Sequence, residues 1–236
     1  MRFCLRLSFI LVLLAAAIDA QTNGPLGAFA FSDGGAVGRF GAGLLFSGGA
    51  GAHVPVTGLS NAFTFESWIN PSSSVWSDFW KQNPDAAGNA IYNLSLTPSG
   101  SIYFAAYHVS NGQVRAYPIF TVPTVPLDAW THVAITYDGA QIRIYFNAVE
   151  VGRRSATGNL LLTSQPMEIG NEFRGRIDEV RIYARALGPA EIALDRATPI
   201  DPLEPFQVSL STPADQSLGV LTTPVSSTFS AAASAQ

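Results

Sequence analysis

The stretch WTHVAITYDGAQIRIYF, from Trp130 to Phe146, carries the clearest fold signal in the chain. Apolar and polar side chains alternate in its two halves, His132 to Tyr137 and Gln141 to Phe146, which is the two-residue period of a half-buried β-strand. Asp138-Gly139 stands between the halves, and this pair tolerates the positive φ angles of a tight turn. The stretch therefore predicts two antiparallel strands joined by a hairpin.

The same alternation recurs on both sides of this hairpin. It is clear in Phe63 to Ile69 and in Ser101 to Phe104, with turn signals such as Pro98-Ser99-Gly100 between the apolar segments. Successive strands without intervening helices favour an antiparallel sandwich over a parallel α/β sheet. One short helix is expected after Gly188, because Pro189 suits a first helical position, and it should end near Ala197.

The first twenty residues have the composition of a secretory signal. Two arginines precede an apolar run from Leu7 to Ala17, and small residues up to Ala20 provide a cleavage position. The run is shorter than the roughly 20 residues of a membrane-spanning helix, so we expect a chain that is secreted, or periplasmic or on the cell surface, and not inserted in a membrane. The single cysteine, Cys4, lies within residues 1–20, so the secreted chain would contain no disulfide.

Charge and length limit the classes of function. The chain has 236 residues and a formal net charge of −4, without long runs of either sign, so it offers no basic surface for nucleic acid or an anionic membrane. Residues 198–236 are rich in Pro, Ser, Thr and Ala, and they are predicted to be a linker or a truncated immunoglobulin-like segment. The remaining length suits one sandwich domain.

Four segments resemble the laminin-G-like domains of the concanavalin A-like lectin/glucanase superfamily. They lie in the same order within residues 27–197, and they are GRFGAGLLF (38–46), FTFESWINP (63–71), WTHVAITYDG (130–139) and FRGRIDEVRIYARALGPAEI (173–192). The resemblance implies an all-β, antiparallel two-sheet jelly-roll with one short C-terminal helix. It also implies a secreted binding module for a glycan or an extracellular protein, either as a monomer or as part of a larger chain.

The resemblance also implies a candidate calcium site. In related sandwiches an acid of the last strand, here Asp178, helps to hold a structural Ca²⁺ together with backbone carbonyls, and such oxygen ligands suit this cation. The alternatives are that Asp178 pairs with Arg176 or only caps a turn. Residues 47–52, after the first core strand, contain no acid, which disfavours a calcium-dependent ligand site on that loop.

No pattern of catalytic residues stands out. Retaining glycoside hydrolases need two carboxylates about 5 to 5.5 Å apart, and the E-x-D-x-x-E strand of the superfamily's glucanases is absent. Glu168 and Glu172 come nearest in spacing, but Gly170-Asn171 between them indicates a turn. We therefore predict a non-catalytic module, with a hydrolase that uses a non-standard carboxylate pair and a purely structural spacer as the alternatives.

Two groups of aromatic and polar residues are candidates for ligand binding. Trp76 and Trp80 lie close together in the sequence and offer flat rings on which a sugar could stack. Strand alternation defines the second group, because residues between core positions point to the opposite face of their sheet. The residues of this second group are Glu66, Trp68, His132, Thr136, Arg143 and Tyr145. They would form a binding concavity, unless neighbouring segments cover that face.

Overall fold

The computed structural model describes residues 24–31, 35–54, 59–82, 92–110, 113–160 and 165–200. The predicted signal segment and residues 201–236 of the predicted linker lie outside these ranges. No helix in the described part of the chain is both long and apolar enough to cross a membrane.

The described residues form two antiparallel sheets, which we call sheet A and sheet B. Sheet A contains, in spatial order, β12 (Val149–Ser155), β11 (Gln141–Phe146), β10 (Thr131–Tyr137), β5 (Phe63–Pro71), β15 (Arg174–Tyr183), β3 (Ala42–Ser47) and β2 (Gly35–Val37), with β1 (Gly27–Phe29) also paired to β15. Sheet B contains β13 (Asn159–Leu160), β8 (Ser101–Ser110), β7 (Tyr92–Leu96), β6 (Ser77–Gln82), β14 (Met167–Asn171) and β4 (Ala52–Val54), with β9 (Gln113–Thr124) also paired to β8.

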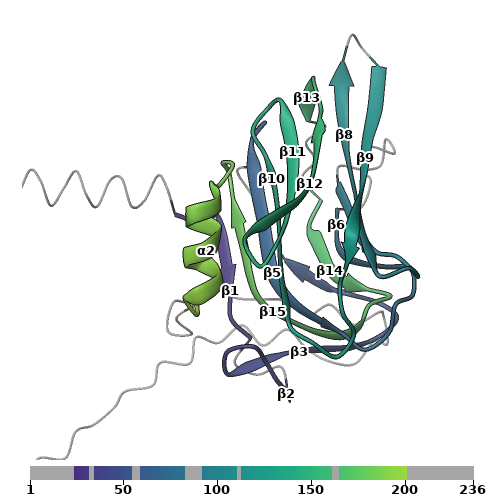
Figure 1. Cartoon of the computed structure of the whole chain (residues 1–236), viewed down its shortest axis with the longest axis vertical. Helices are drawn as coiled ribbons and strands as arrows, with labels where there is room; N and C mark the ends of the chain where they lie inside the picture. The colour runs from purple at the N-terminus through teal and green to yellow at the C-terminus, as the bar shows by residue number, and fades with distance from the viewer. Residues whose placement is uncertain are drawn as a thin grey trace, which may run out of the picture.

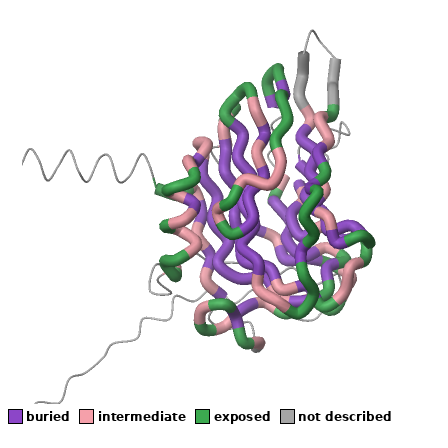
Figure 2. The backbone as a smooth tube through the Cα atoms, viewed as in Figure 1, coloured by how far each residue is buried: buried purple, intermediate pink, exposed green. Residues whose placement is uncertain are grey.

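The molecule has three layers in the order helix, sheet A, sheet B. Helix α2 (Pro189–Ala197) lies on one side of sheet A, and the strands of sheet B lie on the other side (Figure 1). Buried residues concentrate in the strands, whereas loops and the outer side of α2 are exposed (Figure 2). The all-β, two-sheet sandwich with one short C-terminal helix is therefore confirmed.

Aromatic side chains fill the core between the two sheets. The rings of Phe63 and Phe65 stack with centroids 4.6 Å apart, and Tyr92 of the other sheet contacts Phe65 at 5.0 Å. Large buried rings of this kind contribute about 1.5 to 3 kcal/mol each to folding. The alternation in the sequence assigns its inward residues correctly, and the predicted positions found in this core are Phe63, Phe65, Ile69, Val133, Ile135, Ile142, Ile144 and Phe146.

The predicted hairpin and helix are both present. β10 and β11 pair with Tyr137 opposite Ile142, and Gly139 in the turn between them has a φ of 94°. The Oδ1 atom of Asp138 accepts hydrogen bonds from two backbone N–H groups of the same turn. At the start of α2, the backbone N–H of Gly188 donates to the carboxylate of Glu191, which satisfies a donor that the helix itself leaves free.

Candidate functional site

The outer face of sheet A, where the sequence predicts a binding concavity, lies largely under α2. His132 is 0% exposed, Glu66 1%, Tyr145 2% and Trp68 4%. Ile192 of α2 packs in one apolar cluster with Tyr145. These four side chains have no open surface for a ligand, so their prediction as an exposed binding face is corrected: neighbouring segments cover it.

The two remaining members of that group are Arg143, which forms an ion pair, and Thr136, which is buried. The guanidinium group of Arg143 donates to the Oδ2 atom of Asp138 at 2.7 Å. This ion pair lies at the end of the β10–β11 hairpin. Thr136 is 1% exposed. Trp68 is additionally shielded by Arg39, whose guanidinium carbon lies 4.6 Å from the centre of the indole ring.

Glu66 and His132 form a buried polar pair beneath α2. The Oε2 atom of Glu66 lies 3.9 Å from the Nε2 atom of His132. Burial raises the pKa of Glu66 well above its usual value, and nearby Asp195 raises it further. Burial lowers the pKa of His132 to about 3. At neutral pH the imidazole of His132 is therefore uncharged, so the contact is not an ion pair.

Asp178 caps a turn in this structure. Its Oδ2 atom accepts from the backbone N–H groups of Arg39 at 2.8 Å and Phe40 at 3.1 Å, and its Oδ1 atom accepts from Glu179 at 2.9 Å. The turn comes so close that a Cβ on Gly38 would lie 2.4 Å from the Oδ2 atom.

This arrangement does not resemble a cation site. N–H donors point at both oxygens of the Asp178 carboxylate, and hydrogens with partial positive charge repel a cation. The described residues include no group of three or more His, Cys, Asp or Glu side chains placed to hold a metal. The present geometry thus corresponds to the turn-capping alternative, and structural calcium at Asp178 stays a prediction that chelation tests.

The two tryptophans of the candidate platform have different environments. Trp76 is 52% exposed, whereas Trp80 is 2% exposed and its ring stacks on Phe65 at 5.2 Å. The Nε1 atom of Trp80 donates to the Oγ atom of Ser67 in the core. The pairing of β6 with β7 shifts register between Asp78 and Trp80, and this irregularity turns Trp80 inward. The prediction that Trp80 belongs to an exposed platform is therefore wrong.

Trp76 belongs instead to an aromatic strip on the outer face of sheet B. Its ring centroid lies 5.6 Å from that of Tyr103 on β8, which in turn lies 4.8 Å from that of Phe120 on β9. Phe120 is 57% exposed, and neighbouring Val122 is 91% exposed. We call Trp76, Tyr103 and Phe120 the aromatic strip. β8 and β9, which carry Tyr103 and Phe120, lie on the side of the molecule opposite to α2 (Figure 1).

Strand register brings polar side chains beside this strip. One row of directly paired residues runs from the strip toward the far edge of sheet B, and its members are Phe120, Tyr103, Ser95, Asp78 and Asn171. The row next to it contains Ala105, Asn93, Lys81, Glu168 and His53. The outer face of sheet B is thus aromatic at one end and polar across its centre.

Hydrogen bonds hold the polar side chains in place. The Oγ atom of Ser95 donates to the Oδ1 atom of Asp78 at 2.7 Å, and the Oδ2 atom of Asp78 lies 3.7 Å from the Nζ atom of Lys81. The Oγ atom of buried Ser95 is also 2.7 Å from the Oδ1 atom of Asn93, so its hydroxyl group links the side chains of Asp78 and Asn93. Preorganised polar groups of this kind favour ligand recognition over non-specific adhesion.

Glu168 and Glu172, the two carboxylates considered for catalysis, lie in different environments. Glu168 is 6% exposed, and its Oε1 atom accepts from the backbone N–H of Gly51 and from the side chain of Asn171, both at 3.0 Å. Glu172 follows β14 in a turn with a φ of 57° and is exposed. Glu168 thus anchors the loop before β4, and its environment differs from that of Glu172.

An apolar cavity of about 470 Å³ lies where the described chain ends at Ile200. Phe31 and Phe40 line it together with Glu179. The carboxylate of Glu179 already accepts from Arg181 and from the backbone N–H of Ile200. Both bonds are accepted by its Oε2 atom and hold the chain after α2. The other residues that line the cavity are apolar or glycine, so it offers little polar recognition.

Comparison with known proteins places the chain in a family. A model of the Concanavalin A-like lectin/glucanases superfamily matches residues 46–193. The chain belongs to this superfamily. As its name states, the superfamily contains both lectins and glucanases, so membership is compatible with binding and with hydrolysis.

Solved structures that resemble this superfamily member include saccharide complexes. Domain 4 of AbnA, a GH43 extracellular arabinanase from Geobacillus stearothermophilus, in complex with arabinotriose, has a TM-score of 0.60 and 20% identity, over 74% of this chain and 99% of that one. The CBM40 of the Ruminococcus gnavus IT-sialidase, bound to α2,3 sialyllactose, has a TM-score of 0.55 and 13% identity, over 72% and 98%. At these identities the likeness shows the fold.

Human usherin is also similar in sequence. It is 22% identical over 150 residues, which amount to 58% of this chain and 3% of usherin. The chain thus corresponds to a small part of that protein.

Proposed function

We propose that the chain is a secreted, non-catalytic module that binds carbohydrate through the aromatic strip on sheet B. The observation that carries this proposal is the half-exposed Trp76 ring, continuous with Tyr103 and with exposed Phe120. Contiguous apolar groups that are exposed to water mark interaction surfaces. Trp and Tyr suit this role because they supply a large apolar face together with a polar group.

The polar rows beside the strip supply the second element of sugar recognition. A sugar ring has an apolar face of C–H groups and an edge of hydroxyl groups. Asp78 accepts hydrogen bonds, Lys81 donates them, and Asn93 does both. A small number of placed polar groups next to an apolar surface is the usual composition of a specific ligand site.

Two further observations support a secreted, non-catalytic role. Glu168, the buried carboxylate on the same face, is hydrogen-bonded to Gly51 and Asn171, and these contacts favour a structural role for it. The arabinanase whose domain 4 has this fold is described as extracellular, and residues 1–20 have the composition of a secretory signal.

An extracellular protein is the alternative ligand. Val122 is 91% exposed next to Phe120, and adjacent apolar residues on a strand near the sheet edge favour protein docking as well as sugar stacking. A glycan array separates a glycan ligand from a protein ligand, because a module that binds only protein should bind none of the free glycans.

A glycan array with the full chain tests the proposal. We expect binding to a subset of oligosaccharides, and the Trp76→Ala variant should weaken it about tenfold or more, since aromatic anchors dominate such interfaces. Trp76→Phe should retain part of the affinity. Leu194→Ala removes a side chain that is 65% exposed on α2 and should leave binding unchanged. Folded protein that binds no glycan, or that binds equally well with Trp76→Ala, would overturn the proposal.

A further inference from the structure

A second, smaller pocket lies on the outer face of sheet A. It has a volume of about 200 Å³ and is lined by Leu45, Asn70, Ser72, Asp128, Gly175 and Arg176. Arg176 of β15 is directly paired with Leu45 on one side and with Asn70 on the other. Their neighbours Ile69 and Ile177 are fully buried in the core, so Asn70 and Arg176 point away from it.

Backbone contacts shape this pocket. The N–H of Ser72 donates to the carbonyl of Arg174 at 2.9 Å, and the N–H of Asp128 donates to the carbonyl of Pro71 at 2.8 Å. Gly175 has a φ of 138°, and a Cβ at this position would lie 2.2 Å from the backbone oxygen of Asn70. The wall of the pocket is therefore fixed main chain that admits only glycine at position 175.

The polar side chains that line this pocket have unused hydrogen-bonding capacity. Within the described ranges, no hydrogen bond or ion pair involves the side chains of Asn70, Ser72, Asp128 or Arg176, although the other arginines of β15 are engaged. Arg176 offers only donors and Asp128 only acceptors, while Asn70 and Ser72 offer both. A ligand that satisfies all four must carry an anionic acceptor together with several hydroxyl or amine donors.

The size of the pocket limits the ligand further. A volume of about 200 Å³ is below the roughly 300 to 1,000 Å³ of pockets for drug-sized molecules, so the ligand is no larger than about one sugar ring. We propose that this pocket binds a small hydroxylated carboxylate of the uronic acid class. Its carboxylate pairs with the guanidinium of Arg176, and its hydroxyl groups donate to Asp128 and Asn70.

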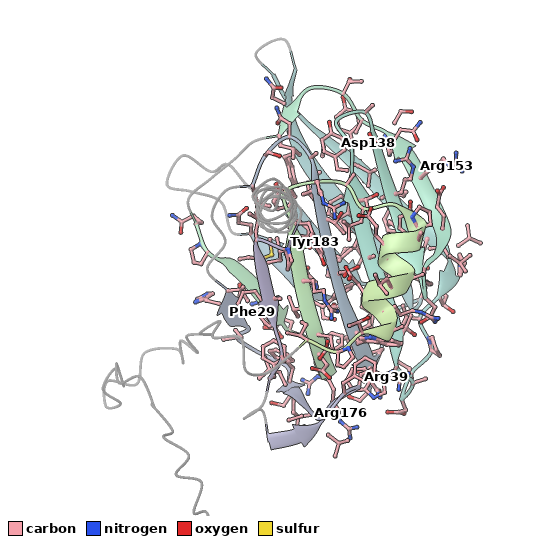
Figure 3. The ribbon with its side chains drawn as sticks, turned by 90° about the vertical axis from the view of Figure 1, so that its left-hand side faces the viewer. Phe29, Arg39, Asp138, Arg153, Arg176 and Tyr183 are labelled. Atoms are coloured by element: carbon pink, nitrogen blue, oxygen red, sulfur yellow. The ribbon has the colours of Figure 1, made fainter. Side chains whose placement is uncertain are left out.

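This site is independent of the aromatic strip. The strip lies on the outer face of sheet B, whereas Arg176 lies on the side that carries α2, near the lower end of the molecule in Figure 3. A uronate is also a different ligand from the neutral oligosaccharide that a stacking surface accommodates, because Arg176 recognises its charge. The two sites therefore have separate tests.

Titration of the ¹⁵N-labelled full chain with glucuronate, followed by backbone amide shifts, tests this site. We expect shifts at residues around Arg176 and Asp128, and none of comparable size with glucose, which lacks the carboxylate. Arg176→Gln should weaken the binding about tenfold or more, because it removes a charge-assisted contact. Arg153→Gln makes the same change of charge at an exposed residue far from the pocket and should leave binding unchanged (Figure 3).

Asp128→Asn separates a uronate from a zwitterionic ligand such as an amino acid. Asp128 has a φ of 54°, which asparagine also tolerates, so the turn is preserved. Glucuronate should bind this variant as well as the native chain, because an amide oxygen still accepts from a hydroxyl group. The free amino acid alanine is the zwitterionic probe. If it binds the native chain more tightly than glucuronate does, and Asp128→Asn abolishes the binding of alanine, the site recognises an amine and the uronate assignment is wrong.

Trp76→Ala distinguishes this inference from the proposed function. It should leave glucuronate binding within about twofold, since the two sites do not share residues. Absence of glucuronate binding to the folded native chain, or loss of that binding with Trp76→Ala and not with Arg176→Gln, would overturn the inference.

Discussion

Asp178 shows how one buried carboxylate organises a distant turn. It lies on β15 and accepts from the backbone N–H groups of Arg39 and Phe40, which precede β3 in the sequence. Asp178→Ala leaves these donors and that of Glu179 without an acceptor, and we expect a loss of about 3 kcal/mol in the free energy of unfolding. Urea denaturation measures this loss. Asp178→Asn, which keeps one acceptor oxygen, should lose less.

The same residue allows a direct test for calcium. If Asp178 only caps the turn, EDTA leaves the melting temperature of the native chain unchanged. A bound structural Ca²⁺ would stabilise the folded state by mass action, and its removal would lower the melting temperature. A drop with EDTA that is reversed by added calcium and absent in Asp178→Asn would establish the calcium site that the family resemblance implies.

Buried His132 makes stability depend on pH on the acid side. Its pKa is about 3 in the folded chain and near 6.5 when unfolded, so only the unfolded state takes up a proton between these values. Stability therefore falls as the pH decreases from 6.5, by up to about 1.4 kcal/mol per unit. His132→Gln should remove this part of the decrease in urea titrations between pH 6.5 and 4. An unchanged slope would show that the imidazole is protonated in the folded state.

Glu66 makes stability depend on pH in the opposite direction. Its folded pKa is raised well above 4.5, so the stabilising contribution of the neutral carboxyl group is complete below pH 4.5 and decreases as the pH rises through the folded pKa. Glu66→Gln should therefore be more stable than the native chain at neutral pH and should lose this advantage near pH 4. Unfolding at the two pH values, compared for both proteins, measures the difference.

At the scale of elements, α2 determines which face of the sandwich is accessible. Ile192 is fully buried on its inner side, against the cluster that contains Tyr145 and Tyr183. Ile192→Ala should destabilise the chain by about 3 kcal/mol and should increase amide exchange in α2, because it leaves a cavity under the helix. The matched variant Leu194→Ala, on the exposed side, should change stability by less than about 0.5 kcal/mol. Equal effects of the two variants would contradict this packing.

The sequence predicts the strands and the helix better than the candidate binding site. The strands and the helix depend on contacts between near neighbours in the chain, whereas the site depends on contacts between residues far apart. The β10–β11 hairpin and the start of α2 depend on neighbours such as Asp138 and Glu191, whose partners lie a few residues away. Strand alternation also assigns Glu66 and His132 correctly to one face. Whether that face is open depends on Ile192, far away in the sequence, and periodicity contains no information about this contact.

The aromatic strip illustrates the same limit. Trp76 is predicted as part of a platform, but its neighbours Tyr103 and Phe120 come together only through the register of β8 and β9. Trp80 is misassigned because regular alternation does not anticipate the register shift after Asp78. A single irregular residue in a strand thus moves a large side chain from the surface to the core.

At the scale of the whole molecule, the core separates two outer faces with different chemistry. The aromatic strip on sheet B is apolar with polar neighbours, whereas the Arg176 pocket on sheet A depends on charge. Screening by salt weakens exposed charge pairs and leaves ring stacking nearly unchanged. We therefore expect added salt to reduce the affinity for glucuronate several-fold, and to change the affinity for a neutral oligosaccharide selected on the array by less than about twofold.

The double variant Trp76→Ala/Arg176→Gln completes this test of two independent faces. Substitutions at sites that share no contacts have additive effects on binding free energy. The double variant should therefore lose as much affinity for the oligosaccharide as Trp76→Ala does, and as much for glucuronate as Arg176→Gln does, each within about 0.5 kcal/mol. Calorimetric titration of the four proteins with both ligands gives the cycle. A coupling larger than about 1 kcal/mol would mean that the core transmits binding between sheets A and B, whereas additivity would mean that the sandwich presents two separate ligand surfaces.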